Sequence, residues 1–498
     1  MTNFQQGNME AAQANFETFL AREPDSGPAR FRLSLVHARR GRFLAAIELG
    51  RQALHEEPDR VELLAHLARC HIACGQPETA RSLATRALSL PREKPIVLDS
   101  LGVVMTRLDE QALAMELFDQ AIALDAGQSA LYFNRGLALK QFGLPEEAER
   151  DFEHCLSLDP AHAKAHWALA TLRTQDLASN HLQRLRDRLL VKPESPADEE
   201  FLALALSKEL DDMSDLDGAA HALLRGIASR RGRASASMHG RADRTDTLMS
   251  VCGEQFFRHP SPAKDGPAPV FVLGMPRSGV ALLGKLLSRH SKIHHLGLQP
   301  VFSRLLSHRL GRDSRRAFDA AAFEQSRALD FDELGRFYLA ETSSAGGKQL
   351  ITCESQPMNF ELAGFIARAL PGARMLNMVR DPLDNCVSIL GHAGGESSLP
   401  SHDPGELAAS YIDQQRLLRH WHHLLPGRIM DVDYESLVEK PEMVLRVICS
   451  FLGIRYASSL RTRLQLHQRS LGRGLRYAGV LPGLQSGLQA AAGKPLVA

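Results

Sequence analysis

The first third of the chain repeats small residues at a constant spacing of 34 positions. Alanine makes up about a tenth of residues, so five alanines in one register arise by chance on the order of once in 100,000 columns. A fixed period of this length predicts a stack of similar units, each of which buries its apolar surface against its neighbours. The alanine column consists of Ala12, Ala46, Ala80, Ala114 and Ala148.

Three further columns in the same register predict that each unit is a pair of helices. A glycine column marks the tight turn between the helices, a second column of small residues lets them pack closely, and a proline column ends the second helix. The glycine column contains Gly7, Gly41, Gly75 and Gly143, with Asp109 as its exception. The second small-residue column contains Ala53, Ala87, Ala121 and Cys155, with Phe19 at its start, and Gly102 and Gly136 occupy a close-packing position of the first helix. The proline column contains Pro24, Pro58 and Pro160, with Arg92 and Ala126 as exceptions.

These positions resemble the tetratricopeptide repeat, whose period continues without insertion over residues 1–175. The resemblance implies an all-α solenoid with a concave surface on which a peptide or partner protein docks. A solenoid that only scaffolds the next domain is the alternative. The chain opens at the turn inside a repeat, so we expect an incomplete first repeat.

Length and composition restrict the remaining possibilities. A chain of 498 residues is long enough for two or three domains, and a net charge of +1 means that any basic site is local. Seven scattered cysteines form neither a disulfide framework nor a paired metal site, so we expect a reducing compartment and no metal. No basic leader or long apolar segment is present, so we expect a cytoplasmic protein without a membrane contact.

Composition shifts divide the chain after the repeats. Residues 176–258 are helical in pattern but out of register, which predicts a capping and connecting region. The proline-rich segment 259–269 predicts a linker, residues 270–481 a second domain, and residues 482–498 a tail.

The second domain begins with a strand, a turn and a helix that together predict an anion site. Val270–Gly274 (VFVLG) is a continuous apolar run typical of a buried parallel strand, and MPRSG leads from it into a helical pattern. This arrangement aims backbone N–H groups and a helix N-terminus at a phosphate, to which Arg277 adds charge and Ser278 a hydroxyl. The lysine of a nucleotide-triphosphatase loop, the G-x-G-x-x-G turn and an obvious Mg²⁺ ligand are missing.

A second strand, arginine and helix follow about 100 residues later, in Ala373–Leu390 (ARMLNMVRDPLDNCVSIL). Arg380 closes the predicted strand, and Ser388 lies two turns into the following helix. An arginine and a serine so placed can bind one phosphate, the arginine through two of its N–H groups.

Together, PRSG after one strand and VRDPLDNCVS after another resemble the sulfotransferases that use 3′-phosphoadenosine 5′-phosphosulfate, most closely the bacterial tetratricopeptide-repeat sulfotransferases and the tyrosylprotein sulfotransferases. The resemblance implies a three-layer α/β domain with a parallel, P-loop-like sheet. It implies that Arg380 and Ser388 hold the 3′-phosphate, that Tyr434 lies near the adenine and that Arg473 lies near the phosphates. The 5′-phosphosulfate would be held by Pro276, Arg277, Ser278, Gly279, Val280 and Ala281.

The catalytic positions of the resembled family are altered in this sequence. Val280 and Ala281 replace two hydroxyl residues after PRSG, and Leu298 and Gln299 follow Gly297 where the family has its catalytic glutamate. His294 and His295 lie close by, and a neutral imidazole can act as a base, so we predict them as substitutes. In CESQPMNF, Ser355 stands where the family has its stabilising lysine and Glu354 where it has an aspartate.

The sequence therefore predicts sulfonate transfer to a hydroxyl acceptor, with protein tyrosines and glycans as candidate acceptors and the repeats as a docking platform. The alternative is a catalytically impaired homologue that binds nucleotide or a protein partner. A nucleotide kinase-like phosphotransferase is disfavoured by the missing lysine and metal ligand. After Glu442 the chain has eight basic residues and no acidic one, which supports an anion site or, alternatively, a solvated basic surface or nucleic-acid patch; we do not expect nucleic acid as the partner.

Overall fold

The computed structural model describes residues 9–231, 241–258, 268–297, 299–312, 318–346, 350–393, 399, 402–462, 464 and 471–492. The chain divides into two compact units, Met1–Pro193 and Glu194–Ala498. This division falls inside the region predicted as a helical connection, and most of that region belongs to the second unit. Much of the predicted linker lies outside the described residues, as do Leu298 and three of the eight basic residues after Glu442, namely Arg463, Arg469 and Lys494.

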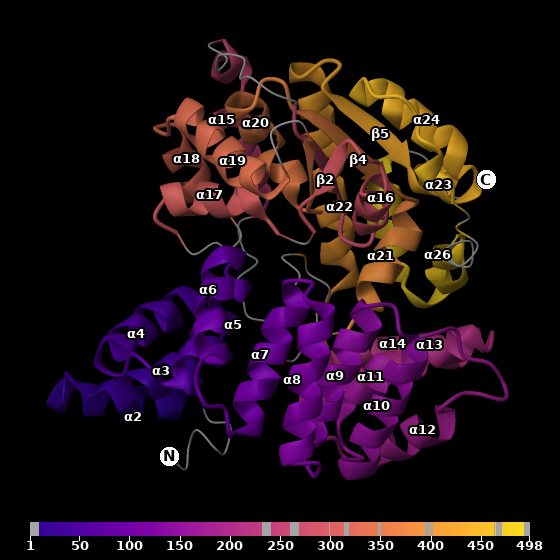
Figure 1. Ribbon diagram of the computed structural model, residues 1–498. Coiled ribbons are helices and arrows are strands. Elements are labelled where there is room, and N and C mark those ends of the chain that lie inside the picture. Colours follow the sequence, from indigo (N-terminus) through magenta and orange to yellow (C-terminus); the bar gives the residue numbers. More distant parts are fainter. Residues whose placement is uncertain are drawn as a thin grey trace. The chain divides into compact units, whose positions relative to one another are not determined.

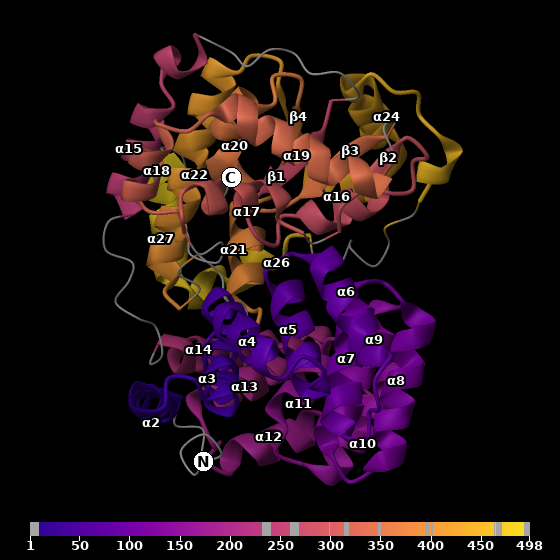
Figure 2. The same ribbon diagram turned by 60° about the vertical axis from the view of Figure 1, so that its left-hand side comes forward.

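The first unit consists of antiparallel helix pairs, as the 34-residue period predicts (Figures 1 and 2). The pairs are α3 with α4, α5 with α6, α7 with α8 and α9 with α10, preceded by α2 and followed by α11 and α12. Their bounds are α2 Met9–Arg22, α3 Gly27–Arg39, α4 Phe43–Glu56, α5 Val61–Ala73, α6 Pro77–Leu88, α7 Pro95–Arg107, α8 Gln111–Leu124, α9 Ser129–Gln141, α10 Pro145–Leu158, α11 Ala163–Ala170 and α12 Leu182–Leu190.

The repeat columns have the structural roles that their residue types predict. All five alanines of the first column are buried, and a Cβ on Gly102 would lie 2.8 Å from the Phe118 ring, so only glycine fits there without a shift. The described turn glycines have positive φ angles. Asp109, the exception in this column, adopts the same left-handed conformation with φ 62°. The turn therefore keeps its left-handed conformation at position 109, although aspartate replaces glycine there.

The second unit contains a five-stranded parallel sheet in the order β2-β3-β1-β4-β5. The strands are β1 Val270–Gly274, β2 Ile293–His295, β3 Ile351–Ser355, β4 Arg374–Val379 and β5 Ile429–Asp433. The helices are α13 Pro196–Asp212, α14 Leu216–Arg231, α15 Arg241–Val251, η1 Glu254–Phe257, α16 Val280–Leu287, α17 Val301–Arg309, α18 Ala320–Ser326, α19 Phe331–Gly346, α20 Asn359–Ala369, α21 Pro382–Leu390, α22 Pro404–Leu424, α23 Tyr434–Glu439, α24 Pro441–Leu452, η2 Ser458–Leu460, α26 Arg473–Tyr477, η3 Ala478–Val480 and α27 Pro482–Ala492.

Helices cover both faces of this sheet, which makes the three-layer α/β domain expected from the sequence. On one face, Val270 and Val272 of β1 pack with α16, α23 and α24 in a single apolar core. On the other face, the ring of Phe271 packs against Phe302 of α17 and Tyr338 of α19. Because strand side chains alternate, β1 supplies both cores and is buried throughout.

The structure also bears on the predicted tail and on the cysteines. The segment predicted as a tail contains α27, which packs on α22. None of the seven cysteines, all of which lie in the described residues, forms a disulfide, and all seven are buried. In the part of the chain that the structure describes, every helix is too short or too polar to cross a lipid bilayer.

Candidate anion-binding site

The sheet brings the two predicted anion-binding segments together. β1 and β4 are parallel neighbours, so the turn after β1 and Arg380 after β4 lie at the same carboxyl edge. The chain leaves β1 toward β2 at one edge of the sheet, whereas it leaves β4 toward β5 at the other. Ligands of open α/β sheets bind where the connections diverge in this way.

The turn after β1 has a backbone that side chains would obstruct. Gly274 has φ 149° and Gly279 has φ 107°, and an added Cβ would lie 2.7 Å from the Met378 carbonyl oxygen or 2.6 Å from the Tyr434 ring, respectively. Arg277 adopts a left-handed φ of 66°, which costs a non-glycine residue about 1 kcal/mol or more. Such strain at a charged residue is typical of a functional turn.

The turn leads directly into the N-terminus of α16, whose first N–H groups have no partner within the helix. The Ser278 hydroxyl is buried and has no hydrogen-bond partner among the described residues. The Val280 side chain lies in the core, so only its backbone N–H can face an anion, whereas Ala281 is exposed. The groups of this turn that could donate to an anion are therefore backbone N–H groups, the Ser278 hydroxyl and Arg277, without the two further hydroxyls of the resembled family.

Arg380 holds the turn in place. It is only 6% exposed, its Nη1 donates to the carbonyl oxygen of Arg277 at 2.9 Å, and its guanidinium stacks on the Tyr434 ring at 4.7 Å. Tyr434 is buried at the start of α23, beneath Gly279. Tyr434 therefore contacts the turn and the arginine, and its predicted place near an adenine remains a prediction.

Arg277 lies among other positive charges. Its Nε donates to the Ser388 hydroxyl at 3.3 Å, which joins the two predicted half-sites. Desolvation, followed by the charges of Arg380 and Arg473, lowers the pKa of Arg277 below its usual value. The positive charges of Arg380 and Arg473 act on Arg277, which favours an anion near it.

The place of Arg473 is fixed by Asp384, a residue that the sequence reading did not single out. The Asp384 carboxylate accepts hydrogen bonds from the backbone N–H groups of Gly472, at 2.7 Å, and Gly474. A Cβ on Gly474 would lie 2.4 Å from the Leu383 backbone, so α26 can approach α21 only through glycine. The only sign of Asp384 in the sequence is an acidic residue inside the VRDPLDNCVS segment. Its hydrogen-bond partners lie about 90 positions away, so the sequence does not show what it binds.

Two more residues support Arg473 and the turn after β1. Asp211 of α13 forms an ion pair with Arg473 at 3.0 Å, and Asn385 donates to the Pro276 carbonyl oxygen at 2.9 Å. Helix α13, predicted as part of a connecting region, thus supplies a counter-charge to Arg473. An incoming phosphate would compete with Asp211 for that guanidinium.

His294 and His295, which were predicted as substitute bases, lie on different faces of the sheet. His294 and His295 are consecutive residues of β2, so their side chains point to opposite faces of the sheet. His295 Nε2 lies 3.0 Å from the Ser355 hydroxyl, and both groups pack against Gly284 of α16. Desolvation, and then the charge of His294, lowers the pKa of His295, so its imidazole is neutral at pH 7.

Glu354 is buried and hydrogen-bonded to neighbouring elements of the fold. It is fully buried, and its carboxylate accepts from the Phe302 N–H at the start of α17 and from the Asn359 amide, both at 3.1 Å. Burial raises its pKa to about 7. Glu354 and Ser355 are adjacent in β3, so Glu354 points away from the α16 face that carries Ser355. The described residues contain no cluster of three or more His, Cys, Asp or Glu side chains that could hold a metal ion.

Comparisons with known proteins match both units. Residues 269–458 match the model of the sulfotransferase family, and tetratricopeptide repeat models match residues 3–61, 37–93 and 129–162. Protein-tyrosine sulfotransferase 2 of Gallus gallus is 24% identical over 210 residues, covering 38% of this chain and 52% of the relative. An uncharacterized protein of Aquifex aeolicus (strain VF5) is 28% identical over 197 residues, covering 37% and 25%.

The chain thus spans about half or less of the length of these two relatives. Among solved structures, the sulfotransferase domain of the Synechococcus PCC 7002 olefin synthase is 18% identical, with a TM-score of 0.29, covering 42% of this chain and 82% of that one. The N-terminal unit of this protein consists of tetratricopeptide repeats, and its C-terminal unit contains a domain of the sulfotransferase family.

Proposed function

We propose that the protein transfers a sulfonate group from 3′-phosphoadenosine 5′-phosphosulfate to a hydroxyl acceptor. The observation that carries this proposal is the joining of Arg277, Arg380 and Ser388 at one edge of the sheet, where Arg380 donates to the Arg277 carbonyl oxygen and Arg277 donates to the Ser388 hydroxyl. A nucleotide with phosphates at both its 3′ and 5′ positions presents negative charge that these arginine guanidinium groups can bind. The match to the sulfotransferase family model and the similarity to protein-tyrosine sulfotransferase 2 of Gallus gallus support the same reaction class.

Each half of the site has a part in this proposal. The nucleotide would supply the activated sulfonate, and the backbone of Pro276–Ala281 with the N-terminus of α16 would bind its 5′ end. Arg380 and Ser388 would bind the 3′-phosphate, and Arg473 would stabilise charge on the phosphates. Tyr434 would then limit the depth of the pocket beneath Gly279.

We assign the general base to His295 rather than His294. The neutral imidazole of His295 can accept a proton from an acceptor hydroxyl, and the hydrogen bond to Ser355 fixes the orientation of the ring. His295→Ala should lower the turnover number at least about 100-fold. His294→Ala, on the other face of the strand, is the matched control and should retain turnover.

A second function remains supported by the same pair of residues. Ser355 occupies the position of the lysine in the resembled family, it is buried, and its hydroxyl is engaged by His295. A site without that cation can bind nucleotide while transferring sulfonate slowly or not at all. Nucleotide binding without turnover is therefore the alternative.

Calorimetric titration separates these functions from a site of another kind. The full chain should bind 3′-phosphoadenosine 5′-phosphate and should bind adenosine 5′-monophosphate, which lacks the 3′-phosphate, at least about tenfold more weakly. Transfer of radioactive sulfonate from the labelled donor to peptide and glycan pools then tests turnover. Equal affinity for the two nucleotides would overturn the 3′-phosphate assignment, and binding without transfer would select the alternative.

A further inference from the structure

Helices α13 and α14 form a hairpin that is built like one of the repeats but belongs to the second unit. The Ser207 hydroxyl of α13 donates to the carbonyl oxygen of Ala219 in α14, twelve positions later, at 2.8 Å. In the first unit, Ser34 donates in the same way to Ala46, also twelve positions later, at 2.6 Å. Ser214, between the two helices, has a left-handed φ of 65°, as the turn glycines of the repeats do. The region predicted as a connection therefore contains one more pair with the packing of a repeat.

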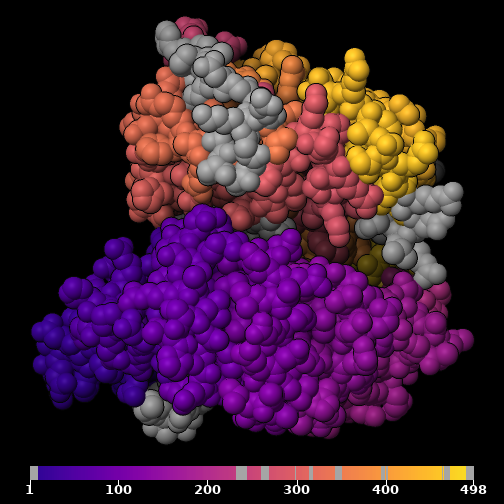
Figure 3. Space-filling model, viewed as in Figure 1, coloured from indigo at the N-terminus to yellow at the C-terminus, as the bar shows by residue number. Residues whose placement is uncertain are grey.

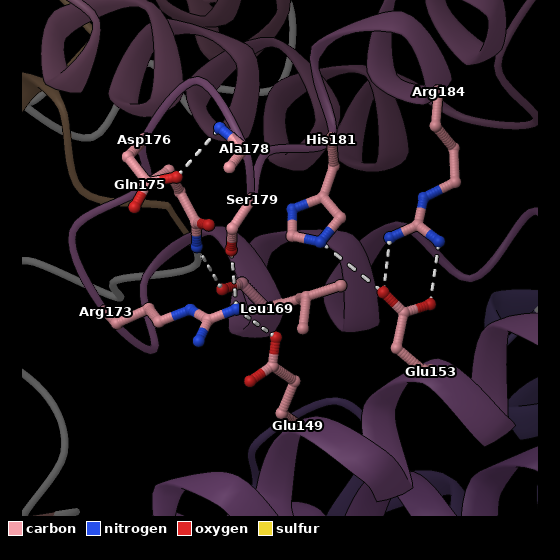
Figure 4. Close-up of polar contacts among 10 residues, drawn as sticks. All are labelled: Glu149, Glu153, Leu169, Arg173, Gln175, Asp176, Ala178, Ser179, His181 and Arg184. Atoms are coloured by element: carbon pink, nitrogen blue, oxygen red, sulfur yellow. Dashed lines mark hydrogen bonds and ion pairs between the residues drawn. The ribbon is translucent and has the colours of Figure 1, made fainter.

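Charged side chains near the end of the first unit bind within that unit. Figure 4 shows that Glu149 of α10 binds Arg173 at 2.6 Å and that Glu153 binds Arg184 at 2.7 Å and contacts His181 at 3.4 Å. In the space-filling view the repeat helices, coloured indigo to purple, form one continuous packed surface (Figure 3). The hairpin differs from this segment, because its charged side chains contact the helices around the candidate anion-binding site.

Arg230, near the end of α14, binds the C-terminal end of α21. Its guanidinium donates to the carbonyl oxygens of Leu390 at 3.3 Å and His392 at 2.7 Å, about 160 positions away in the chain. The last carbonyl groups of a helix have no partner within the helix, and a positive charge stabilises this end. Arg230 therefore caps the helix that carries Ser388, which lies two residues before Leu390.

Glu200 of α13 fixes the orientation of Arg230. One oxygen of its carboxylate accepts hydrogen bonds from Nε of Arg230 at 3.0 Å and from Nη2 at 2.9 Å. The side chains of Arg230 and Glu200 are only 11% and 3% exposed. Burial lowers the pKa of Arg230 to about 10, so its guanidinium is still charged at pH 7. Because a guanidinium donates in several fixed directions, Arg230 joins α13 to the end of α21 through a single rigid group.

The hairpin also contacts the second unit at two other points. Asp211 of α13 forms the ion pair with Arg473, and α14 packs against α26, which begins at Arg473. Arg231 binds the carboxylate of Asp403, the residue that precedes α22, at 2.8 Å. Ser388 and Arg473, both assigned to the phosphates of the nucleotide, are therefore tied to the same pair of helices.

We propose that the α13–α14 hairpin is part of the nucleotide site and that Arg230 is a positioning residue for its 3′-phosphate half. Arg230 would act through the last turn of α21, which holds the Ser388 hydroxyl against Arg277. A hydroxyl that accepts from Arg277 still has its own O–H to donate to a phosphate. The sulfotransferase family match, over residues 269–458, does not include this hairpin. The inference rests on the proposed binding of 3′-phosphoadenosine 5′-phosphosulfate at this site.

The test is titration calorimetry of the full chain carrying Glu200→Gln and Arg230→Gln together. Replacing both residues avoids the unpaired buried charge that either single replacement would leave. The double variant should bind 3′-phosphoadenosine 5′-phosphate roughly tenfold more weakly than the unaltered chain. Adenosine 5′-monophosphate, which lacks the 3′-phosphate, should bind within about threefold of its affinity for the unaltered chain. Circular dichroism during thermal unfolding establishes that the variant is folded.

The hairpin offers a matched control with the same residue types. Arg225 Nε donates to Glu199 at 2.8 Å, and the Arg225 side chain is 43% exposed. Glu199→Gln with Arg225→Gln makes the same two changes in the same two helices and should keep the affinity for both nucleotides within about twofold. A loss as large as that of the Glu200 and Arg230 variant would show that any weakening of the hairpin lowers affinity, and the assignment of Arg230 would be overturned.

Ser388→Ala tests whether Arg230 acts through Ser388. Ser388→Ala should itself weaken the binding of 3′-phosphoadenosine 5′-phosphate by roughly five- to tenfold. Adding Glu200→Gln and Arg230→Gln to it should lower the affinity by less than about a further twofold, because the group that they position is already gone. Additive losses would overturn the proposal, as would an unchanged affinity of the double variant or an equal loss for adenosine 5′-monophosphate.

The same titrations separate this inference from the proposed function. If the proposed function is wrong, the unaltered chain does not bind 3′-phosphoadenosine 5′-phosphate, and the inference falls with it. If only the inference is wrong, the unaltered chain and the Glu200 and Arg230 variant bind that nucleotide equally well.

Discussion

Replacing Arg380 tests the assembly of the anion site most directly. Its guanidinium is buried, donates to the Arg277 carbonyl oxygen and stacks on the Tyr434 ring, so it is already oriented before a ligand arrives. A buried, oriented hydrogen bond to a charged group contributes about 1.5 to 3 kcal/mol. Arg380→Ala should therefore weaken the binding of 3′-phosphoadenosine 5′-phosphate by roughly 100-fold, measured by titration calorimetry.

The design separates charge, geometry and phosphate position. Arg380→Lys keeps the charge and loses the planar fork, so we expect a loss of about tenfold. Adenosine 5′-monophosphate lacks the 3′-phosphate but would still bind the turn that Arg380 holds in place, so Arg380→Ala should weaken its binding too, but much less than that of the 3′,5′-bisphosphate. Arg374→Ala is the matched control, because Arg374 lies at the opposite end of β4 and donates to the Gly427 carbonyl oxygen. The reasoning is refuted if Arg380→Ala binds within about threefold of the unaltered protein, or if the monophosphate loses affinity equally.

Three further predictions concern groups that support the fold and the site. Asp384→Asn leaves one acceptor oxygen for the two N–H groups of Gly472 and Gly474, so Arg473 should be misplaced. The nucleotide affinity measured by calorimetry should then fall about tenfold. An unchanged affinity would show that Arg473 does not contribute to nucleotide binding. Burial raises the pKa of Glu354 from 4.5 to about 7. Between these two pH values the Glu354 carboxyl keeps its proton in the folded state but has lost it in the unfolded state. The free energy of unfolding should therefore fall by at most about 3 kcal/mol as pH rises from 4.5 to about 7. In urea titrations, Glu354→Gln should flatten this slope, and a slope that persists would show that another group causes it. Gly102→Ala places a Cβ 2.8 Å from the Phe118 ring and should destabilise the repeats by about 1 to 3 kcal/mol in thermal unfolding, whereas Gly127→Ala, where the nearest atom is 3.4 Å away, should have little effect.

The repeat unit was predictable from the sequence because its determinants are local and recur. A small residue every 34 positions reports where two neighbouring helices touch, and the described alanines of that column are all buried. Exceptions were harder to interpret. Asp109 breaks the glycine column but keeps the left-handed turn, because aspartate tolerates that conformation better than most residues.

The candidate site was predictable only in part. PRSG and the Arg380 and Ser388 pair could be found because each follows an apolar strand within a short segment, and the structure joins them through Arg277 and Ser388. Asp384 and Asp211 could not be found, because an acidic residue becomes informative only when its distant partner is known. The separation of His294 from His295 depends on which face of β2 is covered, and a three-residue strand gives no clear pattern.

The sequence by itself determined the kinds of unit and the chemical character of the site, because periodicity, buried strands and turn residues act over short distances. Tertiary structure decided which charges meet. Parallel pairing of β1 with β4 places Arg277 beside Arg380, glycine-permitted contact of α26 with α21 adds Arg473, and the alternation of β3 turns Glu354 away from Ser355. These partners are far apart in the chain, and their contacts arise only when the sheet and its helices pack.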